Sequence, residues 1–200
     1  MASMQLGYGA TTLHHWAGIL DGRYSCEELE ELFLNDDKFA AARERIQSTE
    51  ILIIDEISML SKKIIDVCRL FLKKEMVFGG LQVIGCGDFK QLPPVPNYRY
   101  GDDGSYCIES NVFQKTFQHH INLTEVKRQN EPELVRAVTE LCNGTPSEDT
   151  VQLLRSLDRT LPKNVEITRL YGTNFEINYI NHECIEDENG LIFTYKAKNE

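Results

Sequence analysis

Short apolar runs alternate with amphipathic stretches along the chain, and this alternation predicts an α/β protein. Ile51–Ile54 is a fully apolar run that ends in two carboxylates, too short for a buried helix, and it predicts an interior strand of a parallel sheet. Leu81–Gly85 and Glu166–Leu170 predict two further strands. Strands and helices that alternate indicate a parallel sheet covered by helices on both faces. Helices are expected at Ser25–Leu34, Asp37–Gln47, Ser61–Glu75, Glu131–Cys142, Thr150–Leu157 and Asn174–Cys184.

Local signals mark several of these helix ends. Ser25 and Glu28 have the spacing of a capping box, in which each side chain accepts a backbone N–H of the other residue. Pro132 falls in the first turn of its helix, where proline is tolerated, and Gly144 lies just past the end. The segment Thr160–Asn164 has the composition of a linker, so residues 1–162 are expected to form one domain and residues 163–200 the start of a second.

Composition narrows the class of protein without suggesting a ligand. No apolar run approaches the roughly 20 residues that span a bilayer, so no membrane partner is expected. The six cysteines form no C-x-x-C pair, which argues against a disulfide framework or a zinc site and favours reduced thiols inside a cell. The net charge of −10 counts against a protein that holds nucleic acid by charge alone.

The carboxylates after Ile51–Ile54 are the first candidate for chemistry. Four apolar residues followed by Asp55 and Glu56 have the Walker-B form, in which a buried strand delivers acids to the ligand-binding edge of the sheet. Asp55 would hold Mg²⁺, through water, and Glu56 would orient and polarise an attacking water. The pattern is short, and a strand that ends in acidic residues by chance is the competing interpretation.

Two further segments fit a phosphate site. Gly87–Val95 follows the second predicted strand and contains Gln91, a neutral amide able to sense a γ-phosphate or its water, and then rigid prolines. Arg128 stands between an expected strand and a helix, where its guanidinium would reach a phosphate at the sheet edge. On its own the Lys127–Arg128 pair would read as two solvated cations.

The segments Gly9–Ile19 and Leu170–Asn174 suit nucleic acid. Backbone amides and the Thr12 hydroxyl suit the phosphates of a single strand, and His14 or Trp16 could stack on bases. Core packing is the stronger interpretation for Trp16, and a buried, hydrogen-bonded side chain is an equal alternative for His14. Asn174 could contact nucleic acid or nucleotide, although a helix cap is the stronger interpretation there.

Taken in this order, the segments resemble the petite-integration-frequency (PIF) family of helicases, superfamily-one motors of the 5′-to-3′ branch related to the RecD helicases. The resemblance covers roughly Gly9 to His182. It is close at Ile53–Leu60 and Gly87–Val95, and Thr12–Ile19, Phe78–Gln82, Arg128-Gln129 and Tyr171–Asn174 resemble further family motifs, with His15 where the family usually has serine.

The resemblance implies a RecA-like domain in residues 1–162 and the opening of a second one in 163–200. It also implies hydrolysis of ATP with Mg²⁺, with catalytic and nucleotide-binding roles for Asp55, Gln91 and Arg128 and a catalytic role for Glu56. Contacts with DNA are expected from Thr12, His14, Pro93, Pro94 and Asn174. The implied partners are single-stranded and forked DNA, with G-quadruplex DNA and RNA–DNA hybrids as further substrates. The implied role is genome maintenance in the nucleus, or in the mitochondrion.

The chain also departs from the family pattern. It contains no G-x-x-x-x-G-K-[ST] loop, and no glycine is followed by lysine, so the amides and the lysine that cradle phosphates are absent. This predicts a fragment of a helicase with negligible ATPase activity of its own. The alternatives are a non-catalytic module that binds DNA or protein, and a metal-dependent nuclease using Asp55, Glu56 and Asp88. The nuclease is disfavoured because Gln91, the prolines and Arg128 would then have no role.

Overall fold

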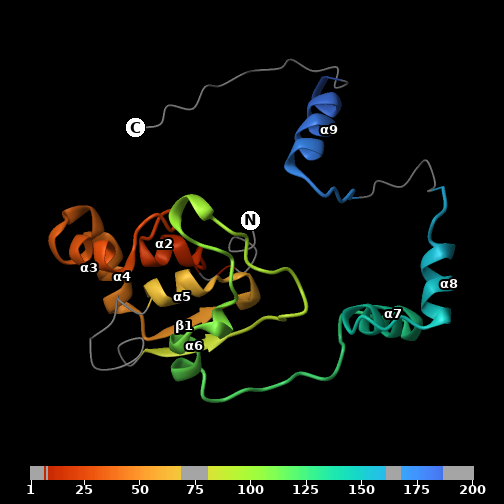
Figure 1. Ribbon diagram of the computed structural model, residues 1–200, viewed down its shortest axis with the longest axis horizontal. Helices are drawn as coiled ribbons and strands as arrows, with labels where there is room; N and C mark the ends of the chain where they lie inside the picture. The colour runs from red at the N-terminus through yellow and green to blue at the C-terminus, as the bar shows by residue number, and fades with distance from the viewer. Residues whose placement is uncertain (1–6, 8, 69–80, 161–167, 187–200) are drawn as a thin grey trace. The chain divides into compact units, whose positions relative to one another are not determined.

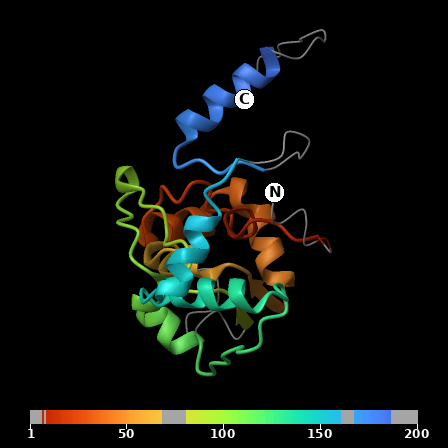
Figure 2. The same cartoon turned by 90° about the vertical axis from the view of Figure 1, so that its right-hand side faces the viewer.

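The computed structural model describes residues 7, 9–68, 81–160 and 168–186. The chain divides into two compact units, Met1–Thr150 and Val151–Glu200, which are considered separately below. The first unit carries the sheet and most of the helices (Figures 1 and 2). Its α-helices and strands are α2 (Leu13–Ala17), α3 (Cys26–Asn35), α4 (Ala40–Ser48), β1 (Ile51–Ile54), α5 (Lys62–Cys68), β2 (Gln82–Gly85), α6 (Asn111–Thr116), α7 (Pro132–Cys142) and the start of α8 (Glu148–Ser156).

The two strands lie side by side and run parallel, as the sequence predicts. Their register pairs Ile51 with Gln82 and Ile54 with Gly85, so both strands end at the same edge of the sheet. The expectation that β1 is buried on both faces is wrong for two of its residues, because Ile51 is 51% and Ile53 is 64% exposed. The buried core cluster includes Leu52 and neither of those two isoleucines, so among the described residues the core packs against one face of β1.

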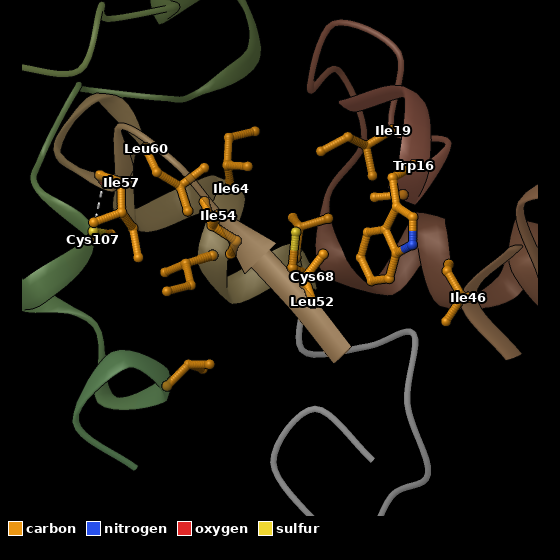
Figure 3. Close-up of a cluster of buried hydrophobic side chains, with 14 of the residues drawn as sticks. Trp16, Ile19, Ile46, Leu52, Ile54, Ile57, Leu60, Ile64, Cys68 and Cys107 are labelled. Carbon is orange, nitrogen blue, oxygen red and sulfur yellow. Dashed lines mark hydrogen bonds between the residues drawn. The ribbon is translucent and has the colours of Figure 1, made fainter. Parts of the chain in front are cut away.

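Side chains from β1 and from helices α2 to α6 contribute to that core (Figure 3). Trp16 is buried among them, and its indole N–H donates a hydrogen bond of 3.0 Å to the Thr49 hydroxyl. Burial together with a satisfied N–H is the usual condition of a core tryptophan. The structure therefore confirms core packing as the role of Trp16.

The helix at Ser25 begins as predicted. The Ser25 hydroxyl accepts the Glu28 N–H at 3.2 Å, and the Glu28 carboxylate accepts the Ser25 N–H at 2.8 Å. The next predicted helix, Asp37–Gln47, is a 3₁₀ turn at Asp37–Phe39 followed by α4. Helix α5 begins one residue later than expected, at Lys62, and the predicted continuation beyond Cys68 lies outside the described residues.

A loop after the prolines folds back on α5. It contains a 3₁₀ turn at Tyr98–Tyr100, closed by paired backbone hydrogen bonds of 2.8 and 3.1 Å between Asn97 and Asp102. A second 3₁₀ turn, Cys107–Glu109, precedes α6. Neither this loop nor α6 was predicted.

Helices α7 and α8 are joined by a polar turn around Glu140. One oxygen of its carboxylate, Oε2, accepts hydrogen bonds from the Thr150 hydroxyl at 2.6 Å and from the Ser147 hydroxyl and N–H at 2.7 and 2.8 Å. Both helices match the sequence prediction within two residues, and Gly144 after α7 takes the left-handed φ of +71° typical of a helix end.

The second unit contains α9 (Asn174–Glu186). Its cap is Thr173, which exchanges hydrogen bonds with Glu176, so the prediction that Asn174 caps the helix is wrong by one residue. The strand predicted at Glu166–Leu170 is not found at Thr168–Leu170, where Leu170 is 92% exposed and no neighbouring strand pairs with it; Glu166 and Ile167 lie outside the described residues. Within the described ranges, no helix has the length and apolar character required to cross a membrane.

Candidate functional site

Strand β1 delivers Asp55 and Glu56 to the edge of the sheet where both strands end. The two side chains are exposed, and the Asp55 carboxylate accepts the Glu56 N–H at 3.0 Å. Glu56 has φ 53° and ψ 44°, the left-handed conformation that side chains rarely adopt. Such strain persists where the surrounding structure imposes it, and it is concentrated at functional sites.

The backbone after β2 holds this turn in place. The Cys86 N–H donates to the Ile54 carbonyl at 2.8 Å, and the Ile57 N–H donates to the Cys86 carbonyl at 2.9 Å. A Cβ on Gly87 would lie 2.9 Å from the Ile57 nitrogen, closer than a side chain can approach. The turn after β1 and the loop after β2 are therefore fixed against each other.

That loop carries Gln91. The Gln91 backbone N–H donates to the Asp88 carbonyl at 3.0 Å, and the Gln91 side-chain amide nitrogen lies 3.5 Å from the Asp88 carboxylate. Phe89 anchors the loop, since its ring makes edge contacts with Tyr106 and Phe113 at centroid distances of 5.9 and 6.2 Å. An anchored loop with an exposed amide beside exposed carboxylates can present hydrogen-bonding groups to a phosphate or a water.

The Thr12–Ile19 segment contains α2 and its two caps, Thr12 and Gly18. The Thr12 hydroxyl accepts the His15 N–H at 3.2 Å and so caps the helix. His14 is half-buried; burial lowers its pKa below 6.5, and the charges of Asp21 and Asp102 oppose this effect. At neutral pH His14 is therefore an uncharged ring, able to stack or to hydrogen-bond but not to neutralise a phosphate.

The two prolines differ in exposure. Pro93 is exposed and Pro94 is buried. The backbone at Gly104 lies against Pro94 and Pro96, since a Cβ there would be 3.2 Å from the Pro94 carbonyl oxygen and 2.8 Å from the Pro96 ring. Pro94 thus packs within the loop, and Pro93 is open to solvent.

Arg128 and Asn174 are predicted site residues that no contact among the described residues brings to this edge. Arg128 lies exposed at a bend before α7, in a segment without the expected strand, and makes no ion pair or hydrogen bond with the described residues. Asn174 is an exposed residue of the second unit. The two parallel strands bring the turn that carries Asp55 and Glu56 against the start of the loop that carries Gln91, through contacts at Cys86 and Gly87.

The side chains at this edge of the sheet are compatible with Mg²⁺, but they include no P-loop to bind all the phosphates of a nucleotide. No group of three metal-binding side chains is found in the described residues, including Asp55, Glu56 and Asp88. Mg²⁺ commonly uses one or two carboxylates, with water and substrate phosphates completing its shell, so a single exposed Asp55 is compatible with it. The sequence supplies no P-loop for the remaining phosphates.

The sequence interpretation missed the Tyr98–Tyr100 turn and the lysine that supports it. The Lys63 ammonium donates to the carbonyl oxygens of Gly22, at 2.8 Å, and of Tyr100. A Tyr-Arg-Tyr triplet after the prolines was the available signal, but nothing local indicates that it folds against a helix 37 residues earlier.

Comparisons with known proteins agree with these motifs. A sequence profile described as PIF1-like helicase matches residues 1–143. The ATP-dependent DNA helicase RRM3 of Saccharomyces cerevisiae is 32% identical over 196 residues, which cover 94% of this chain and 27% of the relative. The chain therefore spans about a quarter of the length of this relative.

Solved structures show the same likeness. The crystal structure of Pif1 helicase from Candida albicans has a TM-score of 0.79 at 30% identity, covering 91% of this chain and 41% of that one. Pif1 helicase from Bacteroides in complex with ADP-AlF3 and ssDNA has a TM-score of 0.76 at 29% identity, covering 92% and 45%. These likenesses confirm the RecA-like α/β class, and because the matched profile spans well over half of the sequence, the chain belongs to the PIF1-like helicase family.

Proposed function

We propose that this chain is part of the motor of an ATP-dependent 5′-to-3′ DNA helicase that acts in genome maintenance. Residues 1–162 would form most of the first RecA-like domain and residues 163–200 the opening of the second. The observation that carries the proposal is the register of β1 and β2, which brings Asp55 and Glu56 beside the Gly87–Gln91 loop. The nucleus is the proposed compartment, with the mitochondrion as the alternative.

Each residue proposed for the nucleotide site would have a separate role in ATP hydrolysis. Asp55 would hold Mg²⁺ through water, and the ion would neutralise charge on the phosphates. Glu56 would orient and polarise the attacking water, and Gln91 would sense the γ-phosphate or that water. Arg128 would contact the γ-phosphate once α7 and the segment before it are brought to the edge.

Contacts with single-stranded DNA are proposed for Thr12, His14 and Pro93, with Pro94 holding the loop and Asn174 contributing from the second unit. Forked DNA is the proposed substrate, and G-quadruplex DNA and RNA–DNA hybrids are further candidates. The net charge of −10 means that these contacts would rely on hydrogen bonds and stacking as well as on charge.

The 200 residues alone are proposed to bind single-stranded DNA without hydrolysing ATP, since the sequence contains no P-loop motif to cradle the phosphates. The test combines calorimetry with an ATP analogue and Mg²⁺, an ATPase assay with oligothymidine, and anisotropy of a fluorescent oligothymidine. We expect neither nucleotide binding nor turnover, but saturable DNA binding. Thr12→Val should weaken this binding, Thr12→Ser should retain it, and Thr11→Val serves as the neighbouring control.

The outcomes separate the parts of the proposal. DNA-stimulated hydrolysis that Glu56→Gln abolishes would show that the site works without a P-loop, provided that Glu50→Gln, at the other end of β1, leaves it intact. Absence of any DNA binding would remove the proposed DNA surface. Tight DNA binding with no detectable nucleotide interaction would also fit the alternative function, a non-catalytic binding module, which the lack of a P-loop motif favours.

A further inference from the structure

The loop that follows the proline segment presents an aromatic and cationic turn. Tyr98, Arg99 and Tyr100 form a single 3₁₀ turn, and Tyr98 is 77% exposed. Figure 2 shows this loop, in light green, projecting from the rest of its unit. Neither the nucleotide edge nor the α2 segment accounts for an exposed tyrosine in this position.

The turn is held rigidly. Backbone hydrogen bonds pair Asn97 with Asp102, and Asp102 in turn accepts the buried Ser61 hydroxyl at 2.6 Å. The Lys63 ammonium donates to the Tyr100 carbonyl from the other side. A rigid loop loses little conformational entropy when a ligand binds to it, which favours recognition.

Cations surround one ring of the turn. The guanidinium of Arg99 lies 5.5 Å and that of Arg23 lies 5.9 Å from the centre of the Tyr100 ring. Arg23 is already paired with Asp21 at 2.7 Å, whereas Arg99 has no carboxylate partner in the part of the chain that the structure describes. Two further pairs of charges lie nearby. Lys62 and Asp103 attract each other. Lys63 donates to the Tyr100 carbonyl, and Asp102 accepts the Ser61 hydroxyl.

Arg99 is therefore the one cation of this group without a described carboxylate partner, and the exposed Tyr98 is its neighbour in the chain. This balance disfavours a ligand held mainly by charge and favours one that stacks on an aromatic face and offers a single anionic contact. A nucleotide of a single strand has both features, a base with a π-face and one phosphate.

The turn also adjoins the other candidate DNA contacts. The Asn97 side-chain amide lies 3.4 Å from the Asp21 carbonyl in the loop after α2, and the charges of Asp21 and Asp102 both reach His14. Gly104, just after the turn, packs against the Pro94 carbonyl and the Pro96 ring. The turn thus lies next to the loop after α2, which follows Thr12 and His14, and next to the proline segment that contains Pro93.

We propose that the Asn97–Asp102 turn is a base-stacking contact for single-stranded DNA, in which the Tyr98 ring stacks on a base and Arg99 contacts a phosphate. This inference rests on the proposed DNA binding of the chain and adds residues to that surface. The turn contributes more through stacking than through charge.

The experiment measures anisotropy of a fluorescent oligothymidine with the 200-residue chain across a salt series. Tyr98→Ala should weaken binding about tenfold, as loss of one stacked base predicts, and should leave the salt dependence unchanged. Arg99→Ala should lower the slope of log K against log salt by about 0.7, the value for one phosphate of a single strand. Tyr98→Phe should bind like the unaltered chain. Because Tyr98 and Arg99 are both exposed, none of these changes should alter the unfolding midpoint.

A spectroscopic variant locates the contact directly. Trp16 is the only tryptophan and is buried, so its emission should respond little to DNA. Tyr98→Trp adds an exposed indole whose emission should be quenched when bases stack on it. The matched control is Tyr179→Trp, at an exposed tyrosine of the second unit, which should not be quenched.

The outcomes distinguish this inference from the function on which it rests. One outcome is that the unaltered chain binds DNA, Tyr98→Ala binds equally well, and Arg99→Ala leaves the salt slope unchanged. The turn is then not a DNA contact, and only this inference fails. If the unaltered chain does not bind DNA, both fail. If quenching of Tyr98→Trp occurs with a protein partner and not with DNA, the turn is a protein-docking surface and the inference is overturned.

Discussion

A Cβ on Gly87 would lie 2.9 Å from the backbone nitrogen of Ile57, so the loop after β2 touches the turn after β1 through bare backbone. This contact places the carboxylates of Asp55 and Glu56 at a fixed position relative to the loop that carries Gln91. The Asp55-Glu56 motif and the Gly87–Val95 motif do not predict this contact separately. It arises because β1 and β2 are parallel and end in register.

Gly87→Ala should therefore disturb the edge of the sheet. The added methyl group would meet backbone atoms that cannot rotate away, and we expect a loss of about 1–3 kcal/mol in the free energy of unfolding. Urea denaturation followed by circular dichroism measures this. The control is Gly172→Ala, where the nearest atom to the added Cβ is a Glu176 oxygen at 4.0 Å. An equal effect of the two changes would contradict the close approach.

Glu56 should carry backbone strain that glycine relieves. Glu56→Gly removes the clash of a side chain in the left-handed conformation, an effect of about 1–2 kcal/mol, and this offsets the entropy that glycine adds to the unfolded chain. We expect unchanged or higher stability, measured as the urea midpoint. Leu20→Gly, at the other described non-glycine residue with positive φ, should behave alike.

The control for this strain is Glu50→Gly. Glu50 precedes the same strand without a positive φ, so glycine there should only add unfolded-state entropy and lower stability by up to about 1 kcal/mol. A loss of stability in Glu56→Gly as large as in Glu50→Gly would show that Glu56 is not strained.

Local signals predicted local structure well. The capping box of Ser25 and Glu28 depends on residues three apart, and both of its hydrogen bonds are present. The bounds of β1 follow from its composition and match the prediction. Exposure of Ile53 could not be predicted, because it depends on what packs against the far face of the sheet and not on the strand itself.

Long-range polar contacts had no sequence signal. Ser61 and Asp102 are 41 residues apart, and neither belongs to a motif, yet they fix the loop after the prolines. Arg128, in contrast, belongs to a motif that predicts a contact with the nucleotide, but it has no partner among the described residues. The Thr173 cap was missed by one residue because threonine and asparagine both favour that position.

The carboxyl group of Glu140 should titrate unusually low. Hydrogen bonds from the Thr150 hydroxyl first, and from the Ser147 N–H and hydroxyl, lower its pKa to about 2. Its folded-state pKa is below the unfolded value, so it stabilises the α7–α8 turn above about pH 4.3 and this contribution is lost as the pH falls towards 2. Carbon-13 NMR titration of the Glu140 carboxyl measures the pKa directly.

A matched pair of variants tests whether the hydrogen bond from Thr150 lowers the pKa of Glu140. Thr150→Val removes the donor and should raise the pKa of Glu140, whereas Thr145→Val, in the same turn, should leave it unchanged. A titration of Glu140 in its ordinary range in the unaltered chain would contradict the hydrogen-bonded turn.

The pair of Ser61 and Asp102 should decide whether the Asn97–Asp102 turn stays in place. Both residues are buried, and the Ser61 hydroxyl donates to Asp102 while it also accepts the Ile64 N–H at the start of α5. Ser61→Ala leaves a buried carboxylate oxygen without this donor and the helix without this cap. We expect a loss of about 2 kcal/mol in the free energy of unfolding, in the range for hydrogen bonds to charged groups.

Local release of the turn should accompany this loss. Trypsin should cleave after Arg99 faster in Ser61→Ala than in the unaltered chain, because the backbone of a held turn must open before a protease can bind it. Ser48→Ala is the control, since its hydroxyl donates to the Arg45 carbonyl at the exposed end of α4 and its loss should change stability by less than about 0.5 kcal/mol. Equal midpoints and equal cleavage rates in the two variants would mean that the Ser61–Asp102 hydrogen bond does not anchor the turn. The rigidity on which base stacking by Tyr98 depends would then have to come from Lys63 and the backbone hydrogen bonds between Asn97 and Asp102.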